Sequence, residues 1–439
     1  MKKILIPAVF LLVFHSYAIS TESYNLQEFL SLVEKHSKDL MLAEKELDMA
    51  KVRKKEALST ALPELSASGN YSRNLGRNFL YIDFPDFETG ETQEQKFQIS
   101  YWNEFGFNLS LRQTLFSFKI GNALKAAKQY QKLTDFVYDS QCQAVIGFAK
   151  KAFYRTLLLM KVWEVTKGSE ENARENFEMV KKKYDNGLAS KFELLQAETR
   201  WENIKPETMK ARRNYELALN NLKNFAGIPV QKEISLDGDF DDCPSMPDSI
   251  QFEKILEQRP DFNALLWEQK LRGTDVKAQT SEYYPTLKAN FVLYNMRAQS
   301  DKFKLDRKNV NYWVALTLSI PIFNGGFTSA QVNKAKIELE ITRIKIDKTK
   351  EAIYNEIRNI YLRLEESRKR ISSSEKSLET AQEAFKIAES STASGLATQL
   401  ELKDTRLLFD QAKLNYYSAV YDYLAAYFDW ELAVGLVKK

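Results

Sequence analysis

Acidic residues near two glycine-containing segments are the side chains best suited to chemistry in this 439-residue sequence. Glu401 and Asp404 are three residues apart, so a helix would place both carboxylates on one face. Glu193 holds the corresponding place in an earlier segment, where Gln196 replaces the second acid. Rings of carboxylates attract cations in pores, whereas single acids at a helix start are favoured by the helix macrodipole. These residues alone leave both interpretations open.

The composition argues against an enzyme or a metalloprotein. Of the two histidines, His15 lies in a segment that we expect to be removed, so His36 alone remains. A single histidine cannot build a multi-histidine metal site and offers little choice for a Ser/His/Asp arrangement. The 63 basic residues nearly balance the 59 acidic ones, so no basic surface for nucleic acid is expected. We expect no catalytic residues, no cofactor and no metal.

Residues 1–18 have the pattern of a secretory signal peptide. Two lysines precede a short apolar run, and small residues stand at the third and first positions before a cleavage site after Ala18. The alternative, a membrane anchor, is less favoured because the apolar run is shorter than the ~20 residues that span a bilayer. Cys142 and Cys243 could then form a disulfide in an oxidising compartment, or remain two thiols.

The chain contains an internal duplication with a spacing near 208 residues. The segment GLASKFELLQAETR from Gly187 matches GLATQLELKDTRLL from Gly395, and Gly227 and Gly435 close the two copies. A period of this length indicates duplication of a whole structural unit. The expected organisation is a first repeat over 19–227, a linker in an equatorial region over 228–250 and a second repeat over 251–439.

Long helices are expected to dominate each repeat. No Pro or Gly occurs from Phe327 to Ala393, and a heptad pattern alternates bulky and small residues along this run. Such a helix would be about 100 Å long, too long to fold back on one small core. We therefore expect two extended antiparallel hairpins. Short helices open the first repeat, and the other expected helices span about 118–185, 189–226, 261–281, 327–393 and 396–436.

Four segments have the period of β-strands. Between Phe105 and Leu111, for example, large apolar residues alternate with small or polar ones. This pattern over about 10 residues is typical of strands in outer-membrane barrels, although a half-buried sheet of a soluble protein shows it too. The signal peptide favours the membrane interpretation. Strands are expected at about 64–74, 103–116, 285–295 and 312–323, with the intervening segments 73–104 and 296–311 as loops.

Four strands are too few to close a barrel in lipid, because the smallest such barrels have about eight. An open sheet edge would leave backbone groups without hydrogen bonds in the outer-membrane lipid. The chain is therefore expected to oligomerise, and three copies would supply twelve strands.

Two motifs resemble those of the outer membrane efflux protein (TolC) family. They are the strand exit LSIPIFNGGFTSAQVNKAK from Leu318 and the turn GLATQLELKDTRLLFDQAK from Gly395. The resemblance covers nearly the whole chain after the signal peptide. It implies a homotrimer in the outer membrane whose β-barrel continues as an α-helical tunnel into the periplasm. It also implies a passive exit duct for tripartite efflux or type I secretion, with a periplasmic adaptor (membrane fusion) protein and an inner-membrane pump as partners.

The resemblance also assigns expected positions to individual residues. Glu401, Asp404 and Glu193 would lie at the periplasmic aperture, and Gly187 and Gly395 would form the hairpin-tip turns. The strand–helix joint of the second repeat would consist of Pro321, Gly325 and Gly326.

Two departures from the family pattern are visible. The first repeat reads QTLFSFKIGN at the corresponding joint, without the proline and the glycine pair. Ala397 stands where the type member has a basic residue that helps to close the tip, so any closure here must use other residues. A rival interpretation is a periplasmic coiled-coil adaptor or scaffold without a membrane span, which leaves the four alternating segments without a purpose. The exported substrate and the type of pump stay open.

Overall fold

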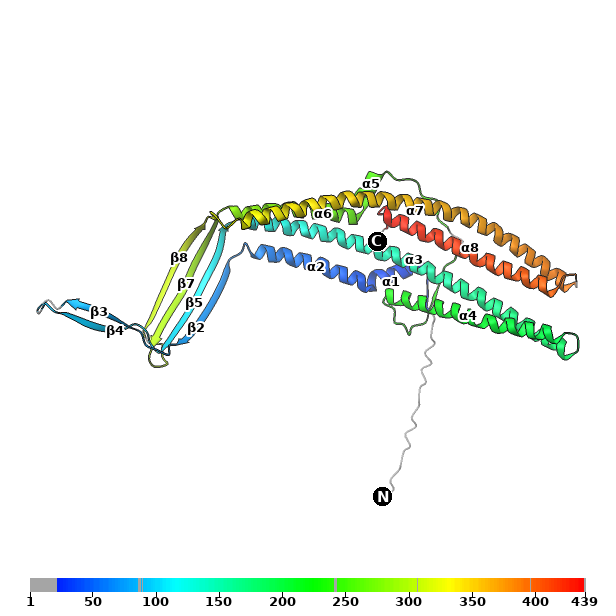
Figure 1. Ribbon diagram of the computed structural model, residues 1–439, viewed down its shortest axis with the longest axis horizontal. Coiled ribbons are helices and arrows are strands. Elements are labelled where there is room, and N and C mark those ends of the chain that lie inside the picture. The colour runs from blue at the N-terminus through cyan, green and yellow to red at the C-terminus, as the bar shows by residue number, and fades with distance from the viewer. Residues whose placement is uncertain are drawn as a thin grey trace, which may run out of the picture. The chain divides into compact units, whose positions relative to one another are not determined.

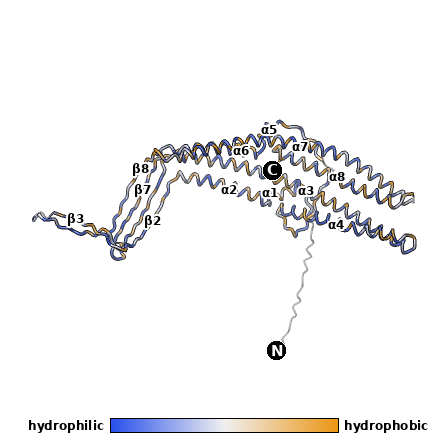
Figure 2. The backbone as a smooth tube through the Cα atoms, viewed as in Figure 1, coloured by the Kyte–Doolittle hydropathy of each residue, from blue (hydrophilic) through white to orange (hydrophobic). Residues whose placement is uncertain are grey.

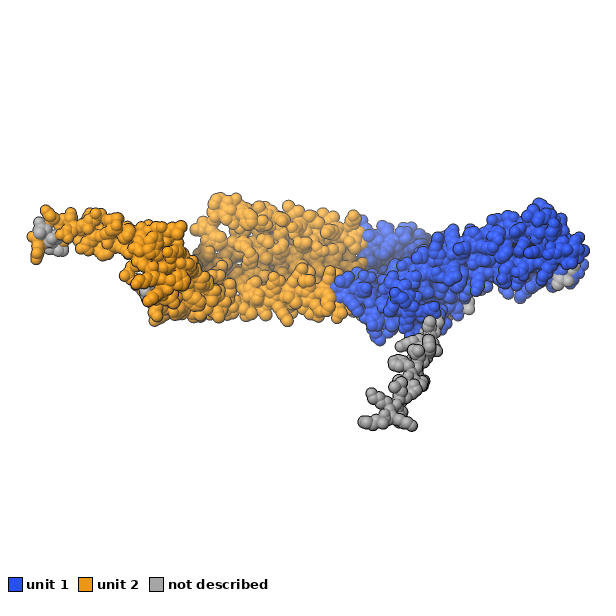
Figure 3. Space-filling view, turned by 90° about the horizontal axis from the view of Figure 1, so that it is seen from below, with its two compact units in different colours: residues 1–43, 139–259, 351–439 blue, residues 44–138, 260–350 orange. Residues whose placement is uncertain are grey.

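The computed structural model describes residues 22–85, 88, 90–240, 243–305, 307–394 and 396–437. The expected signal peptide and Gly395 lie outside the described residues. The chain divides into two compact units, shown in different colours in Figure 3. Unit 1 comprises Met1–Ala43, Asp139–Arg259 and Glu351–Lys439, and unit 2 comprises Glu44–Tyr138 and Pro260–Lys350. The fold is mainly helical.

Unit 2 contains a four-stranded antiparallel sheet. Its strands are β2 (Glu64–Arg73), β5 (Asn103–Phe116), β7 (Thr286–Ser300) and β8 (Lys308–Ser319). They lie in the order β2-β5-β7-β8, as Figure 1 shows. The central pairing of β5 with β7 joins a strand of the first repeat to a strand of the second, which leaves β2 and β8 as the two edges.

The strand register sorts the side chains onto two chemically different faces. On one face, Leu65 is opposite Leu111, which is opposite Phe291, which is opposite Val314. On the other face, the hydroxyls of Ser66 and Ser110 lie 3.1 Å apart, in a cross-strand pair of small polar residues. Because side chains alternate along a strand, this register gives the sheet one apolar and one mainly polar face.

The prediction that residues 73–104 form a loop is wrong in part, because this segment contains an antiparallel hairpin. Strand β3 (Phe79–Pro85) pairs with β4 (Thr92–Gln98) as a separate two-stranded sheet. The Lys96 amine lies 3.9 Å from the centroid of the Phe79 ring, and such cross-strand aromatic contacts stabilise a pleated pair. The second expected loop is also shorter than 296–311, because β7 extends to Ser300 and β8 begins at Lys308.

The helices of unit 2 connect through polar contacts. The elements are α2 (Lys38–Ser59), α6 (Pro260–Thr280), the 3-10 turn η1 (Ser281–Tyr283) and parts of α3 (Phe118–Asp185) and α7 (Phe327–Ala393). Arg53 of α2 donates to the Tyr130 hydroxyl of α3 at 2.6 Å, and Arg272 of α6 pairs with Glu338 of α7 at 2.8 Å. Within the described part of the chain, no helix combines the length and the apolar character needed to cross a membrane.

Unit 1 is built around two helical hairpins. Its further elements are α1 (Leu26–His36), α4 (Lys191–Phe225), α5 (Phe252–Gln258) and α8 (Gln399–Ala433), and β1 (Glu22–Tyr24) pairs in parallel with β6 (Ile234–Leu236). Helix α3 leads into α4, and α7 leads into α8. Figure 2 shows apolar residues interspersed with polar ones along these helices. This mixture is expected where each helix buries only a stripe.

Two groups of buried side chains contribute to the core of unit 1. In one, Phe29 of α1 packs against Phe153 of α3, with ring centroids 5.7 Å apart and both side chains almost fully buried. The other consists of side chains from α5, α7 and α8, among them Ile255, Leu364 and Tyr423. The sulfur atoms of the buried Cys142 and the exposed Cys243 are not joined in a disulfide.

Candidate functional site

The turns at the ends of the two hairpins of unit 1 carry most of the expected site residues. Gly187 adopts a φ of 74°, which residues with a side chain rarely adopt, and its neighbour Leu188 donates to the carbonyl of Lys183 at 2.8 Å. In the second turn, the backbone N–H groups of Leu396 and Ala397 both donate to the carbonyl of Ser391, at 2.8 and 3.2 Å. Both connections therefore satisfy carbonyls at the end of a long helix.

Glu193 and Glu401 occupy equivalent positions in two helix caps. The Glu193 carboxylate accepts from the backbone N–H of Ser190 at 2.7 Å, and the Glu193 N–H donates to the Ser190 hydroxyl at 3.2 Å. The Glu401 carboxylate accepts from the N–H of Thr398 at 2.7 Å, with a return bond of 3.2 Å. These are reciprocal capping boxes that start α4 and α8. The backbone N–H bonds of Ser190 and Thr398 lower the pKa of Glu193 and Glu401, respectively.

We expect the hairpin tips to loosen in acid. Because the folded pKa of Glu193 and of Glu401 lies below the ordinary value near 4.3, each carboxylate stabilises its cap above that value. The stabilisation is lost as the pH falls through the lowered pKa. Hydrogen exchange of the backbone amides in residues 188–194 and 396–402 should therefore lose protection below about pH 4. In the double variant Glu193→Gln with Glu401→Gln this pH dependence should vanish; equal acid sensitivity in both proteins would contradict it.

Asp404 has different surroundings from Glu401, although the two are close in sequence. Its charge acts on the guanidinium of Arg200 in α4, where burial lowers the Arg200 pKa and Asp404 opposes that effect. Glu401 is therefore part of a helix cap, whereas Asp404 is close enough to Arg200 of α4 for their charges to interact. Both side chains are exposed, so within one chain neither is removed from solvent.

A polar cluster around Asp410 was missed by sequence reasoning. Asp410 is 9% exposed, and its carboxylate accepts from the Ser169 hydroxyl of α3 at 2.5 Å and from Arg406 Nε at 3.2 Å. The Arg406 guanidinium lies 5.0 Å from the centroid of the Phe385 ring of α7. The cluster thus ties α8 to both α3 and α7. Arg406 and Asp410 are four residues apart, which was a usable signal, but Ser169 had none.

The expected strand–helix joint lies in unit 2 and is separate from the tip residues. Gly325 and Gly326 both have positive φ values, 67° and 82°, immediately before α7 begins. Pro321 follows the end of β8 and cannot donate a ladder hydrogen bond. This sequence forces the chain out of the sheet and into the helix.

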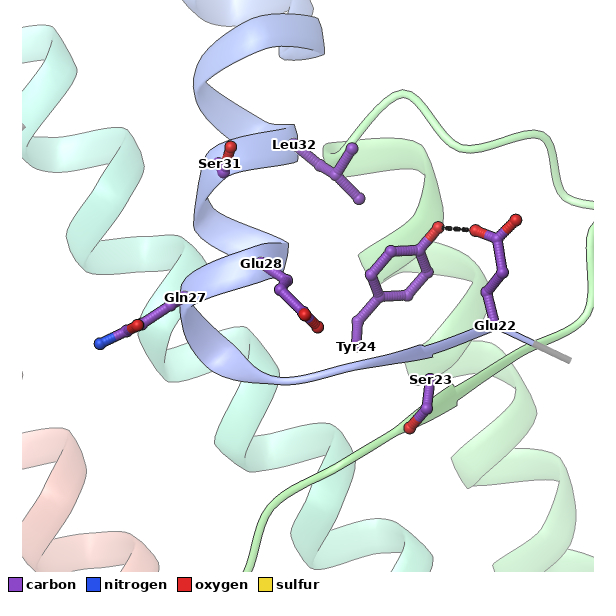
Figure 4. A pocket seen from close by; sticks show the side chains of 7 residues that line it. All are labelled: Glu22, Ser23, Tyr24, Gln27, Glu28, Ser31 and Leu32. Atoms are coloured by element: carbon purple, nitrogen blue, oxygen red, sulfur yellow. Dashed lines mark hydrogen bonds between the residues drawn. The ribbon is translucent and has the colours of Figure 1, made fainter.

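A cavity of about 590 Å³ near the start of unit 1 offers no further chemistry. Figure 4 shows its lining, which comes from β1 and α1. The Glu22 carboxylate is paired with Lys232 at 2.7 Å and accepts from the Tyr24 hydroxyl, and Glu28 accepts from the N–H of Asn25 at 3.1 Å. The described residues also include no group of His, Cys, Asp or Glu able to hold a metal ion.

Comparisons with known proteins agree with this architecture. The family model described as "Outer membrane efflux protein" matches residues 29–228 and 252–435. The alkaline protease secretion protein AprF of Pseudomonas aeruginosa is 24% identical over 66% of this chain and 60% of its own length. TolC of Escherichia coli is 20% identical over 82% of this chain and 71% of its own length. The chain thus aligns with less than two thirds of AprF.

Solved structures show the same fold. The CmeC outer membrane channel of Campylobacter jejuni superposes with a TM-score of 0.77 at 21% identity, covering 93% of this chain and 85% of that one. The outer membrane protein VceC of Vibrio cholerae gives a TM-score of 0.70 at 16% identity, covering 93% and 96%.

Proposed function

Because the chain belongs to the outer membrane efflux protein family, we propose that it is the outer-membrane channel of a tripartite efflux or type I secretion system. It would be a passive duct that extends into the periplasm and takes its driving force from an inner-membrane pump. The observation that carries this proposal is the four-stranded sheet with one apolar face, one polar face and two open edges.

The apolar face of the sheet suits contact with lipid. Its large side chains are exposed in the single chain: Leu65 is 62% exposed, Leu316 is 68% exposed and Leu318 is 61% exposed. A soluble protein rarely leaves such a contiguous apolar face in water. Lipid on this side and water on the other is the arrangement of an outer-membrane barrel strand.

The open edges of the sheet argue for a trimer. Edge strands β2 and β8 each present unpaired backbone groups, which are costly in hydrocarbon. All three neighbouring strand pairs of the sheet are antiparallel, so the two edge strands β2 and β8 run in opposite directions. Strand β8 of one copy can therefore pair antiparallel with β2 of the next. Three copies would close twelve strands into a barrel, and the long helices would continue it as a tunnel.

The hairpin tips would form the closed periplasmic end. Glu401 and Asp404 from three chains would place six carboxylates around one aperture, with Glu193 nearby in the first repeat. The Asp410 cluster would hold α8 against α3 in the closed state, in place of the basic residue missing at Ala397. A periplasmic adaptor would meet the turns at Gly187 and Gly395.

The periplasmic scaffold is the weaker alternative. It accounts for the heptad pattern of the long helices. It leaves the exposed apolar face of the sheet without a partner, and it does not explain why the sheet has one apolar and one polar face.

The acidic aperture is testable by electrical recording. Reconstituted channels should prefer cations and should be blocked by multivalent cations from the periplasmic side, because close carboxylates repel one another and bind counterions. The double change Glu401→Ala with Asp404→Ala should lower the K⁺/Cl⁻ permeability ratio several-fold and relieve the block. The matched change Glu340→Ala with Asp347→Ala, exposed acids of α7 in unit 2, should alter neither. Unchanged selectivity and block in the first variant would contradict the acidic aperture and would show that Glu401 acts only as a helix cap.

A further inference from the structure

We propose that the polar face of the sheet is a second, oppositely charged selectivity element, in which Lys288 and Arg297 attract anions. This inference rests on the proposed function, because it requires that the polar face line the pore. It assigns to β7 a role in deciding which charged solutes leave the channel, in series with the acidic hairpin tips.

The register places both cations on the polar face. Arg297 is opposite Gly106 of β5 and Asn309 of β8, and Lys288 is opposite Thr114 and Thr317. A register shift between Val292 and Asn295 changes the parity of β7 between the two cations, so that an odd-numbered and an even-numbered residue share one face. The alternation of the sequence alone would have assigned them to opposite faces.

The polar neighbours of the two cations on this face are amides and hydroxyls, and Val292 and Trp313 lie between the two rows. The Asn295 amide donates to the Asn108 side chain at 3.2 Å, in a row that continues to Asn311. Beside it, the Asn70 side chain occupies the space over Gly106, in the row of Arg297: a Cβ atom on Gly106 would lie 2.1 Å from the Asn70 Oδ1 atom. Such groups solvate an ion without trapping it as an opposite charge would.

The charges of this face do not cancel. The carboxylates are Glu64 and Glu104, and the cations are Arg112, Lys288 and Arg297. Arg112 pairs with Glu64 at 3.6 Å, and Glu104 accepts from the neutral Asn74 amide at 2.8 Å and keeps its charge. Three cations and two carboxylates therefore leave this face of each chain with a net positive charge. Lys288 and Arg297 are exposed, and neither forms an ion pair with another described residue.

A net positive charge on a pore wall raises the local concentration of anions. The effect reaches about one Debye length, ~8 Å at 0.15 M salt and ~30 Å at 0.01 M, so it should grow as the salt is diluted. A structural role of the same side chains would not depend on salt in this way.

The test is the reversal potential of reconstituted full-length channels in KCl gradients. The double variant Lys288→Gln with Arg297→Gln should lower the Cl⁻/K⁺ permeability ratio at least two-fold in dilute KCl and less in concentrated KCl. Arg297→Lys keeps the charge and should match the wild-type protein. Lys308→Gln is the matched control, because Lys308 is opposite Ala298 and therefore lies on the apolar face, one position away from the row of Arg297.

An unchanged ratio in the double variant overturns the inference, while the tip variants with Glu401 and Asp404 still test the proposed function. An equal shift in Lys308→Gln also overturns it, because the face would then be misassigned. If the double variant does not insert, the single variants Lys288→Gln and Arg297→Gln provide the same comparison. If the wild-type protein forms no channels, both the proposed function and this inference are wrong.

Discussion

Replacing Gly435 with alanine should lower the free energy of unfolding of unit 1 by about 3 kcal/mol or more. Gly435 has a φ of 74°, and it follows α8 in a turn in which Leu436 donates to the carbonyl of Glu431 at 2.9 Å. A Cβ atom at this position would lie 2.7 Å from the carbonyl oxygen of Gln258 and 3.3 Å from the backbone nitrogen of Arg259. Because backbone atoms cannot rotate away from the new Cβ atom, this overlap remains. Its energetic cost adds to the cost of holding alanine in a left-handed backbone conformation.

The matched control is Gly273→Ala in the middle of α6. Apart from its chain neighbours and the backbone of its own helix, no atom lies within 4 Å of a Cβ atom built there, so alanine should stabilise this helix by about 0.5–1 kcal/mol. Urea unfolding followed by circular dichroism measures both variants. Equal midpoints for Gly435→Ala and the wild-type protein would show that the end of α8 does not pack against Gln258.

Replacing Phe153 with alanine should cost about 3–5 kcal/mol, because a buried aromatic side chain would be replaced by a cavity. Phe153 is 1% exposed and packs against Phe29 and beside Leu157, whose side chain is fully buried. These contacts fasten α1 to α3.

Phe148 provides a comparison on the same helix. Its side chain is 57% exposed and contacts Phe225 with ring centroids 5.2 Å apart, so Phe148→Ala should cost less than about 1 kcal/mol. Thermal unfolding of both variants in the same detergent gives the ranking. A cost for Phe148→Ala that equals the cost for Phe153→Ala would contradict the described core.

Much of the architecture was predictable because it follows from local periodicity. Helix α7 spans Phe327–Ala393, which is the run without Pro or Gly, and β5 spans Asn103–Phe116, where apolar and polar residues alternate. The family itself was predictable from the strand exit around Gly325 and Gly326 and from the repeated turn. Both signals lie within single short segments of the chain.

Other features depend on contacts that no local pattern shows. The β3–β4 hairpin has almost entirely exposed strands, so it lacks the burial that creates alternation in a sequence. Asp410 meets Ser169 only because α8 packs against α3, across 241 positions of the chain. The acids of the two capping boxes were visible in the sequence near a helix start, but the reciprocal hydrogen bonds of Glu193 and Glu401 depend on the backbone geometry at the first turns of α4 and α8.

If three copies of this sheet close one barrel in the outer membrane, chemical cross-linking in outer-membrane extracts should detect the contacts between neighbouring copies. Each test variant carries one introduced cysteine on β8 and one on β2, at positions that would face each other across the contact between neighbouring copies. These cysteine pairs should join neighbouring copies through the two open edges. The cross-linked species should stop at three chains and should persist in unheated detergent gels. A monomer that inserts into the outer membrane and forms no cross-link between β8 and β2 would contradict it.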